Sequence, residues 1–477
     1  MEKYSLWLDN ISYEKEPILK EDIDCDVLIV GCGMTGLSTA YHLKNSNLKI
    51  VVVEKKQIGR GISARTTGKV TYLQDTIYSD LTNTYSETIA KKYFYSQKDA
   101  IELISSIVNQ EKIDCNMKKV SSYIFSKEKE SLQKEKKMLK QFGVSIVEAN
   151  KEGYYAIGVE DTYVFHPIKY IQALKDICKK DGIQFYEHTD INFIKEEDRG
   201  YICGNEFIKV KAKKVVLACH YPYFLFPFLM PLKCTLEKSY ISATPVKKTE
   251  SYSAISIEKP IISLRYHEAE ENYLIYLTNS HSLYKEYDDQ KHFEELKKCL
   301  ERLELNPKYL WSNHDIMTFD KLSFIGLLKT NLYLATGYNT WGMTNSNLAG
   351  KIISDMIMDI YNPYETLFSP KRKLKKLSLP ETIYGGIKPM IENKVWKNKD
   401  WYPENVYFET RNGKNVAIYV DKLKKEHIVY NTCPHLKCSL LFNSVEKTWD
   451  CPCHGSRFDL DGKVIIGPSN YDITYHE

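Results

Sequence analysis

The sequence predicts an α/β domain followed by a small all-β module, and three observations carry this prediction. A β-branched apolar run at residues 26–30 leads into a glycine-rich turn and then into a stretch with helical spacing. The same succession of strand, glycine-bearing loop and helix returns near residue 332. The last residues of the chain, about 90 of them, instead alternate short β-type runs with turns. The length of 477 residues is enough for such an arrangement of several domains.

The first glycine turn, GCGMTG at residues 31–36, lies between a strand at 26–30 and a helix predicted at 37–44. A second apolar run at residues 50–53 ends in Glu54, about twenty residues after the glycines. Glycines at this spacing let backbone N–H groups approach a pyrophosphate at the helix N-terminus, and the acid binds ribose hydroxyls. The motif predicts a dinucleotide site, with a glycine turn that holds no nucleotide as the alternative.

The middle of the chain mixes helices and short strands. Helical spacing of apolar residues predicts helices at residues 87–109, 127–143 and 168–180. Strand-like runs follow at residues 184–186, 215–218, 239–244, 261–265 and 272–277. The apolar stretch 215–232 is broken by three prolines, which predicts a buried strand that runs into a loop and not a membrane span.

The second glycine-bearing loop, GYNTWG at residues 337–342, follows a short strand at 332–336 and precedes a helix predicted at 343–360. Here too a strand brings backbone amides to the start of a helix. Five basic residues then stand in the six positions 371–376, and Pro and Gly follow up to Pro389. We interpret residues 373–388 as a linker between a first region, 1–372, and a second, 389–477.

The second region contains strand-like runs at residues 406–409, 416–420, 427–431 and 464–466. It also holds four of the twelve cysteines; the other eight are scattered from Cys25 to Cys299 and are interpreted as buried thiols of a reducing compartment. The four form two boxes, CPHLKC at residues 433–438 and CPCHGS at 451–456. Cys and His at C-x-H-x15-C-x-x-H spacing resemble the signature of Rieske iron–sulfur domains. A zinc site is the alternative, but zinc does not explain the additional cysteine in each box.

The Rieske resemblance implies a [2Fe–2S] cluster with two thiolates on one iron and two neutral imidazoles on the other. It assigns the ligands as Cys433, His435, Cys451 and His454, and it implies a disulfide between Cys438 and Cys453 that joins the two loops.

Three further features of the second region match the same family. Ser456 matches a hydroxyl that donates a hydrogen bond to a bridging sulfide, and Gly467-Pro468 matches a loop that covers the cluster. Phe458 stands where some members have a Tyr, which removes one hydrogen bond and is expected to lower the potential.

The first region resembles the FAD-dependent oxidoreductases related to D-amino-acid oxidase and to sarcosine and glycine oxidases. The resemblance rests on the glycine turn with Glu54, the GRGISARTTGK loop at residues 59–69, the strand ending in Ala218 and the loop at 336–344. It implies a Rossmann-like FAD-binding domain, built from segments of about 24–80, 150–235 and 325–370, with an inserted α+β substrate domain. The implied FAD contacts are Gly31, Gly33, Met34, Thr35, Gly36, Glu54, Lys55, Gly61, Ser63, Arg65, Thr66, Thr67, Gly68, Gly337, Gly342, Met343 and Thr344.

The two resemblances together imply a dehydrogenase that takes a hydride from the carbon of a CH–NH or CH–NH2 group of an amine or amino acid. The flavin accepts the hydride, and single electrons leave through the cluster to an external one-electron carrier or another acceptor. Arg265 is a candidate to pair with a substrate carboxylate, with an ordinary structural ion pair as the alternative. His220 and Tyr240 are further catalytic candidates, and Tyr266 and His267 are weaker ones.

Two other functions remain open at this point. The chain could be an electron-transfer flavo-iron–sulfur protein that serves a partner enzyme and has no amine substrate of its own. The Rieske module could also be a structural or redox-sensing appendage. If the two centres are coupled, the Rieske tip is expected near the dimethylbenzene edge of the flavin, either in the same chain or in a partner chain.

The net charge and the N-terminal sequence indicate which classes of partner to expect. The 66 Lys and Arg against 62 Asp and Glu leave a net charge of +4, well short of the basic excess that nucleic-acid binding needs. The first ten residues contain no apolar signal-peptide core and no twin-Arg pair, so we expect a cytoplasmic protein without a membrane span. A homo-oligomer is compatible with the sequence.

Overall fold

Both glycine-bearing turns follow strands of one eight-stranded sheet. The structure is a computed structural model that describes residues 5–221, 233–283, 289–374, 405–435, 437–453, 455–467, 469 and 471–476. The strands of the sheet run in the order β16-β17-β10-β1-β2-β7, and the pairs among β17, β10, β1, β2 and β7 are parallel. The strands are β1 (Ile23–Val30), β2 (Ile50–Val53), β7 (Gln184–Tyr186), β8 (Phe193–Glu197), β9 (Gly200–Gly204), β10 (Lys209–Leu217), β16 (Phe324–Lys329) and β17 (Leu332–Thr336).

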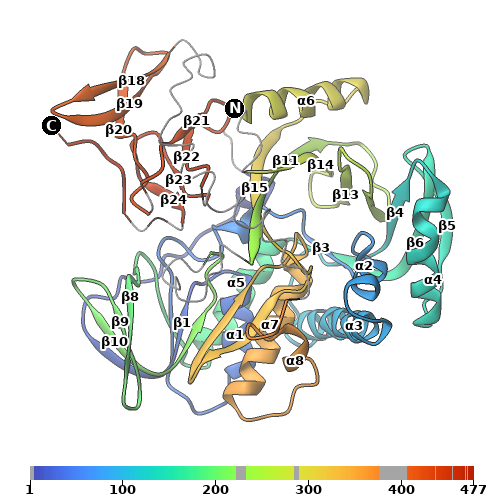
Figure 1. Cartoon of the computed structure of the whole chain (residues 1–477), viewed down its shortest axis with the longest axis horizontal. Coiled ribbons are helices and arrows are strands. Elements are labelled where there is room, and N and C mark those ends of the chain that lie inside the picture. Colours follow the sequence, from blue (N-terminus) through green and yellow to red (C-terminus); the bar gives the residue numbers. More distant parts are fainter. Residues whose placement is uncertain are drawn as a thin grey trace.

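The central strands of this sheet are apolar because both of its faces are covered. Val27 and Ile29 of β1 pack in one core cluster, whereas Leu28 packs in another, and all three side chains are fully buried. Three helices form a layer beside the sheet (Figure 1), and α1 contacts the other two. They are α1 (Met34–Leu43), α5 (Pro167–Lys180) and α7 (Gly342–Ile357). Gly350 permits the close approach of α7 to α1, since a Cβ there would lie 2.2 Å from the Ser38 hydroxyl oxygen.

A second sheet of nine strands, mostly antiparallel, stands beside the first (Figure 1). Its order is β15-β11-β14-β13-β12-β4-β6-β3, and β5 pairs with β6. The strands are β3 (Lys69–Val70), β4 (Lys118–Ser126), β5 (Val147–Lys151), β6 (Tyr154–Val164), β11 (Cys234–Pro245), β12 (Tyr252–Ser256), β13 (Ser263–His267), β14 (Tyr273–Ser282) and β15 (Tyr309–Thr318). Helix α6 (Asp289–Arg302) packs on β11 and β14 through its apolar side chains, such as Phe293 and Leu296.

The remaining helices surround these sheets. They are α2 (Ile77–Thr84), α3 (Glu87–Gln110), α4 (Gln133–Gln141) and α8 (Glu365–Phe368), with short 3-10 helices η1 (Leu6–Leu8), η2 (Ile62–Ala64) and η3 (Lys129–Leu132). Helix α3 begins at a Ser86 cap, whose side chain accepts a hydrogen bond from the Ile89 amide. None of the helices in the described part of the chain combines the length and the apolar composition that a membrane crossing requires.

The C-terminal region forms a separate all-β module (Figure 1). It contains a three-stranded and a four-stranded antiparallel sheet, made of β18 (Val406–Arg411), β19 (Lys414–Val420), β20 (Glu426–Tyr430), β21 (Leu441–Asn443), β22 (Thr448–Asp450), β23 (Arg457–Phe458) and β24 (Val464–Ile466). The buried Trp449 and Phe458 lie in its core together with the four cysteines of the two boxes.

The predicted fold class, an α/β domain with an α+β insertion followed by an all-β module, is confirmed. Local differences remain: the helix expected at 127–143 is divided into η3 and α4, and the strand expected at 239–244 is part of the longer β11. β6 lies in a segment that the sequence assigned to FAD binding, yet it pairs in the second sheet. The proline-rich part of the stretch 215–232, from residue 222, and residues 375–388 of the expected linker lie outside the described residues.

Candidate functional site

A cavity of about 1910 Å³ lies between the two sheets and is lined on one side by residues 464–467 of the C-terminal module. Its lining comes from the glycine turn after β1, the loop 54–67, strands β11 and β15, the loop 335–343 and residues 464–467. All the FAD contacts implied by the sequence line this cavity except Gly36, Gly68 and Thr344. Segments far apart in the chain therefore meet around one space.

The turn between β1 and α1 has the shape that a bound pyrophosphate needs. Gly31 has φ +100°, and a Cβ there would lie 2.9 Å from the Ala218 carbonyl oxygen. Gly33 is the N-cap of α1, and the Ser63 hydroxyl accepts a hydrogen bond of 3.1 Å from the Met34 amide. Because Gly31 and Gly33 have no side chains, the cavity reaches the backbone at the start of the helix.

Glu54 follows β2 and lines the same part of the cavity. Its carboxylate accepts hydrogen bonds from the backbone N–H of Cys32 (2.9 Å) and of Lys56 (3.0 Å). Burial raises the pKa of Glu54 above its ordinary value, and these two hydrogen bonds oppose that shift. The acid is therefore held in a fixed orientation beside the glycine turn, as a ribose-binding residue requires.

The second glycine loop meets the first at the start of α7. Gly337 has φ +74°, and a Cβ there would lie 2.5 Å from the Thr318 Cγ2 atom. The hydroxyls of Tyr338 and Thr35 form a hydrogen bond of 2.7 Å that joins the two loops. Sequence reasoning missed Tyr338, although its position inside the glycine loop was a usable signal.

We expect Gly31→Ala to lower the FAD content of the purified protein at least tenfold. The new methyl group would meet the Ala218 carbonyl at 2.9 Å, and φ +100° is costly for any L side chain. Flavin absorbance against protein absorbance measures the loss. Circular dichroism checks that the variant is folded; a folded variant with a full FAD complement would contradict the assignment of this turn.

Arg265, expected to bind a substrate carboxylate, does not line the cavity. Its guanidinium is fully buried behind the loop 66–68, where it donates hydrogen bonds to the carbonyls of Gly68 (2.8 Å) and Phe165 (3.1 Å). It also contacts His267 Nδ1 at 3.0 Å, and burial lowers the pKa of Arg265 to about 9. The side chain is thus committed to protein groups, and its position suits it to hold the Gly68 loop in place.

The other catalytic candidates separate in space. His220 lines the cavity, and burial lowers its pKa to about 4. Tyr240 lies outside the cavity lining and donates a hydrogen bond to Asp289 on α6. Tyr266 and His267, on β13, also lie outside the lining. The structure therefore brings only His220 of this group to the cofactor residues.

Strands β11 and β15 form a wall with two different faces. Side chains alternate between the faces of a strand, so Glu237 and Ser239 line the cavity while Lys238 and Tyr240 point to the other side. In the same way Asn313 and Asp315 of β15 line the cavity. The opposite face contacts α6 and the C-terminal module.

The two cysteine boxes form adjacent loops at one end of the C-terminal module. The predicted disulfide between Cys438 and Cys453 is present and is confirmed. Cys433 and Cys451 are buried beside it, and the Cys451 Sγ lies within 4.8 Å of both disulfide sulfurs. Short backbone hydrogen bonds fix the loops, from the Cys433 amide to the Cys438 carbonyl (2.8 Å) and from the Cys451 amide to the Ser456 carbonyl (2.6 Å). Thiol donors on two clamped loops fit an iron–sulfur cluster.

The remaining predicted features of the module are only partly described. His435 is half-buried, and His454 and Pro468 lie outside the described residues. Ser456 is fully buried, and its hydroxyl accepts a hydrogen bond of 2.8 Å from the Ser469 amide. This bond ties the second box to the loop that was expected to cover the cluster.

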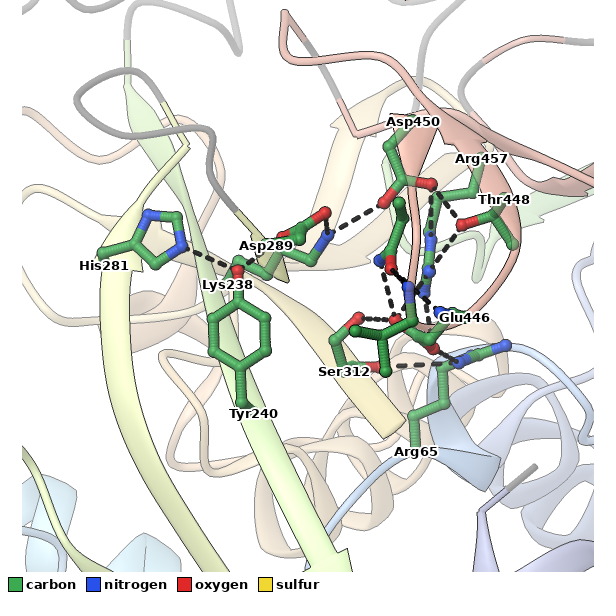
Figure 2. Close-up of polar contacts among 12 residues, drawn as sticks. Arg65, Lys238, Tyr240, His281, Asp289, Ser312, Glu446, Thr448, Asp450 and Arg457 are labelled. Atoms are coloured by element: carbon green, nitrogen blue, oxygen red, sulfur yellow. Dashed lines mark hydrogen bonds and ion pairs between the residues drawn. The ribbon is translucent and has the colours of Figure 1, made fainter. Parts of the chain in front are cut away.

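A buried network of charges joins the module to the wall (Figure 2). Lys238 on β11 makes ion pairs of 2.8 Å with both Asp450 of the module and Asp289 of α6. Burial alone would raise the pKa of Asp450, but the guanidinium of Arg457 and the ammonium of Lys238 hold it well below its usual range. The carboxylate is therefore ionised and bound from both sides.

Glu446 forms the second centre of this network (Figure 2). It forms ion pairs with Arg457 of the module at 2.7 Å and with Arg65 of the loop 54–67 at 3.2 Å. The Ser312 hydroxyl of β15 also donates a hydrogen bond to it. Arg65 was predicted as an FAD contact; it lines the cavity, and it also links the cavity to the module.

The loops around the cysteine boxes also contact the first region directly. Lys55, next to Glu54, donates a hydrogen bond to the carbonyl of Ser469. Gly455 lies against β15, since a Cβ at this position would be 3.0 Å from His314 Nδ1. Val464 to Gly467 line the cavity itself. The end of the module that carries the two cysteine boxes thus faces the cavity within a single chain.

Two family models match the chain. The model of FAD-dependent oxidoreductases (DAO) matches residues 26–356, and the model of the Rieske [2Fe-2S] domain matches residues 392–476. The chain belongs to the FAD-dependent oxidoreductases and carries a Rieske domain. Its cofactors are FAD and a [2Fe–2S] cluster.

Relatives of this FAD-dependent oxidoreductase show the same combination or parts of it. It is 30% identical to YhfW of Bacillus subtilis (strain 168), whose name describes a Rieske 2Fe-2S iron–sulfur protein, over 97% of this chain and 95% of that one. It is 24% identical to the gamma-glutamylputrescine oxidoreductase of Escherichia coli (strain K12), over 71% and 85% of the two chains. Glycine oxidase from Geobacillus kaustophilus has the same fold over 73% of this chain and 99% of its own, with a TM-score of 0.62 and 15% identity.

Proposed function

We propose that this oxidoreductase oxidises an amine or amino acid at the carbon that bears nitrogen, and that the electrons leave one at a time through the Rieske cluster to an external acceptor. FAD supplies a hydride acceptor when bound, and the cluster supplies a one-electron carrier. The observation that carries the proposal is the position of the Rieske domain. Residues 464–467 line the same cavity as the two glycine-bearing turns to which we assign FAD binding.

We assign the cluster ligands as Cys433, His435, Cys451 and His454. The first three lie on the two loops that the disulfide joins, and His454 follows Cys453 directly in the second box. Each loop then supplies one thiolate and one imidazole, as a Rieske cluster needs.

The residues of the chain have three roles in this proposal. The glycine turns and Glu54 orient the cofactor, and the charge network fixes the Rieske domain over the cavity. Residues 464–467 of the docked domain also line that side of the cavity. The amine class is supported by the similarity to a gamma-glutamylputrescine oxidoreductase.

Anaerobic mixing of the holoprotein with a panel of amines and amino acids tests the proposal. A true substrate is expected to bleach the flavin absorbance first and the cluster absorbance afterwards, within one turnover. A panel in which nothing bleaches the flavin, together with reduction of the flavin by a reduced carrier protein, would contradict it. That result would support an electron-transfer protein without an amine substrate.

A further inference from the structure

The cavity face of the β11–β15 wall carries an acidic and polar patch. Glu237 is paired in register with Asp315, and Ser239 is paired with Asn313, so the four side chains form two adjacent rows. All four line the cavity. We call these residues the polar wall.

The two acids of the polar wall each accept a hydrogen bond, and neither forms an ion pair with a cation in the part of the chain that the structure describes. Glu237 accepts a hydrogen bond of 3.0 Å from the Ser280 hydroxyl, and Asp315 accepts one of 3.0 Å from the Asn313 side-chain amide. Among the ion pairs of the described residues, none includes Glu237 or Asp315. By contrast, the buried Asp450 and Glu446 each have a basic partner.

Two neutral side chains beside the acids each have one polar atom that is not satisfied. Asn313 and Ser239 are each 5% exposed, and the Asn313 Oδ1 atom and the Ser239 hydroxyl have no hydrogen-bond partner among the described residues. A buried acceptor without a donor destabilises the folded protein, so such groups usually face a ligand or water. An amide oxygen can only accept hydrogen bonds, so the Asn313 Oδ1 atom would be satisfied by an N–H or O–H donor of a molecule bound in the cavity.

We propose that the polar wall binds a cationic nitrogen group of the substrate, an ammonium or guanidinium separate from the amine that is oxidised. This inference rests on the proposed function and narrows its substrate class to diamines, polyamines and other amines with a second positive group. Hydride transfer is favoured from a carbon that bears a neutral amine, because the nitrogen lone pair stabilises the iminium product. Two carboxylates would hold an amine protonated, so the polar wall suits the group that does not react.

The charges near the polar wall agree with a cationic ligand. Burial and the neighbouring Glu237 raise the pKa of Asp315 to about 7, and a third acid of the cavity, Asp75, has its pKa raised to about 6, chiefly by burial. A bound cation would favour the ionised form of each group. A substrate carboxylate would be repelled by the two acids of the polar wall.

A metal ion fits the polar wall less well. In the described part of the chain, the group of potential metal ligands that converges within 4.8 Å consists of Cys438, Cys451 and Cys453. The carboxylates of the polar wall do not converge in this way, whereas a long organic cation can reach both rows.

The test compares 1,4-diaminobutane with butylamine, which has the same chain but a single nitrogen. Binding to the anaerobic holoprotein is measured by calorimetry and, separately, by flavin bleaching. We expect Asp315→Asn and Glu237→Gln each to weaken diamine binding about tenfold or more and to change butylamine binding less than about twofold. Glu206→Gln is the matched control, because it removes the same charge from an exposed residue outside the cavity lining and is expected to change neither.

Each outcome separates the inference from the proposed function. Diamine binding that depends on Asp315 supports the polar wall even if no flavin bleaching follows, and in that case only the amine oxidation fails. Equal effects of the variants on diamine and butylamine would overturn the inference while amine oxidation stands. Mg²⁺ or Ca²⁺ binding that is lost in Asp315→Asn would overturn it in favour of a metal site. Ser239→Ala, with a smaller expected loss, gives a second reading if Asp315→Asn does not fold.

Discussion

The Cys451→Ser protein is expected to lose its iron–sulfur cluster and keep its FAD. Cys451 is buried at the junction of the two boxes, and a serine hydroxyl is a much poorer ligand for iron than a thiolate. Iron should fall from about two atoms per chain to near zero, since both irons leave with the cluster. Metal analysis and the EPR signal of the reduced protein measure the loss, and flavin absorbance measures the retained FAD.

Cys299→Ser provides the control for this experiment. Cys299 is half-buried on α6 and lies outside the two boxes, so its replacement should leave the iron content unchanged. Zinc in place of iron in the unmodified protein would contradict the ligand assignment. The Cys451→Ser variant also tests the electron relay. Because its cluster is missing, its flavin should still be reduced by a true substrate, but few electrons should reach a one-electron acceptor.

The Glu446→Ala substitution is expected to destabilise the protein by about 3–5 kcal/mol, because it removes the carboxylate that pairs with the buried Arg65 and one of the two that pair with the buried Arg457. Glu446 is the common partner of Arg457 and Arg65, and it also accepts from Ser312. The Rieske domain should then separate more easily from the cavity. Denaturant unfolding measures the stability, and rapid mixing with a reducing substrate measures slower cluster reduction after flavin reduction.

Glu409→Ala is the matched control within the same domain. Glu409 also pairs with an arginine, Arg411, but this pair is at the surface, with side chains about one third exposed. A surface ion pair contributes about 0–1 kcal/mol, so this variant should unfold nearly like the parent protein. If both variants behaved alike, the buried network would not be what fixes the Rieske domain.

The cofactor motifs could be predicted from the sequence because each is local. The glycines at 31–36 need left-handed or crowded backbone, and the Cys and His boxes have a fixed spacing, so both signals survive without knowledge of the fold. The same holds for the Cys438–Cys453 disulfide, which follows from the family pattern and is present.

The substrate side could not be predicted in the same way. Which face of a strand meets the cavity depends on the register of the whole sheet. Both faces of β11 are covered over much of its length, so burial is continuous from Lys238 to Thr244. Tyr240 was therefore a candidate from the sequence, whereas Glu237 was not, and only the structure places Glu237 in the cavity and Tyr240 outside its lining. Arg265 was misassigned for a related reason. A buried arginine can bind a substrate carboxylate or donate hydrogen bonds to backbone carbonyls, and here it donates to the carbonyls of Gly68 and Phe165, which are distant in the sequence.

Successive side chains of β11 face the cavity and the Rieske domain in turn, so neighbouring positions of the strand contact different parts of the molecule. Glu237 and Ser239 are free to change with the ligand, whereas Lys238 is constrained by the domain docked behind it. Directed evolution of ligand preference can therefore randomise the first pair without disturbing the docking of the electron carrier. Conversely, in a homologous chain that lacks a C-terminal domain, a lysine at the position of Lys238 would lose the partner that corresponds to Asp450 and keep only the one that corresponds to Asp289 on α6.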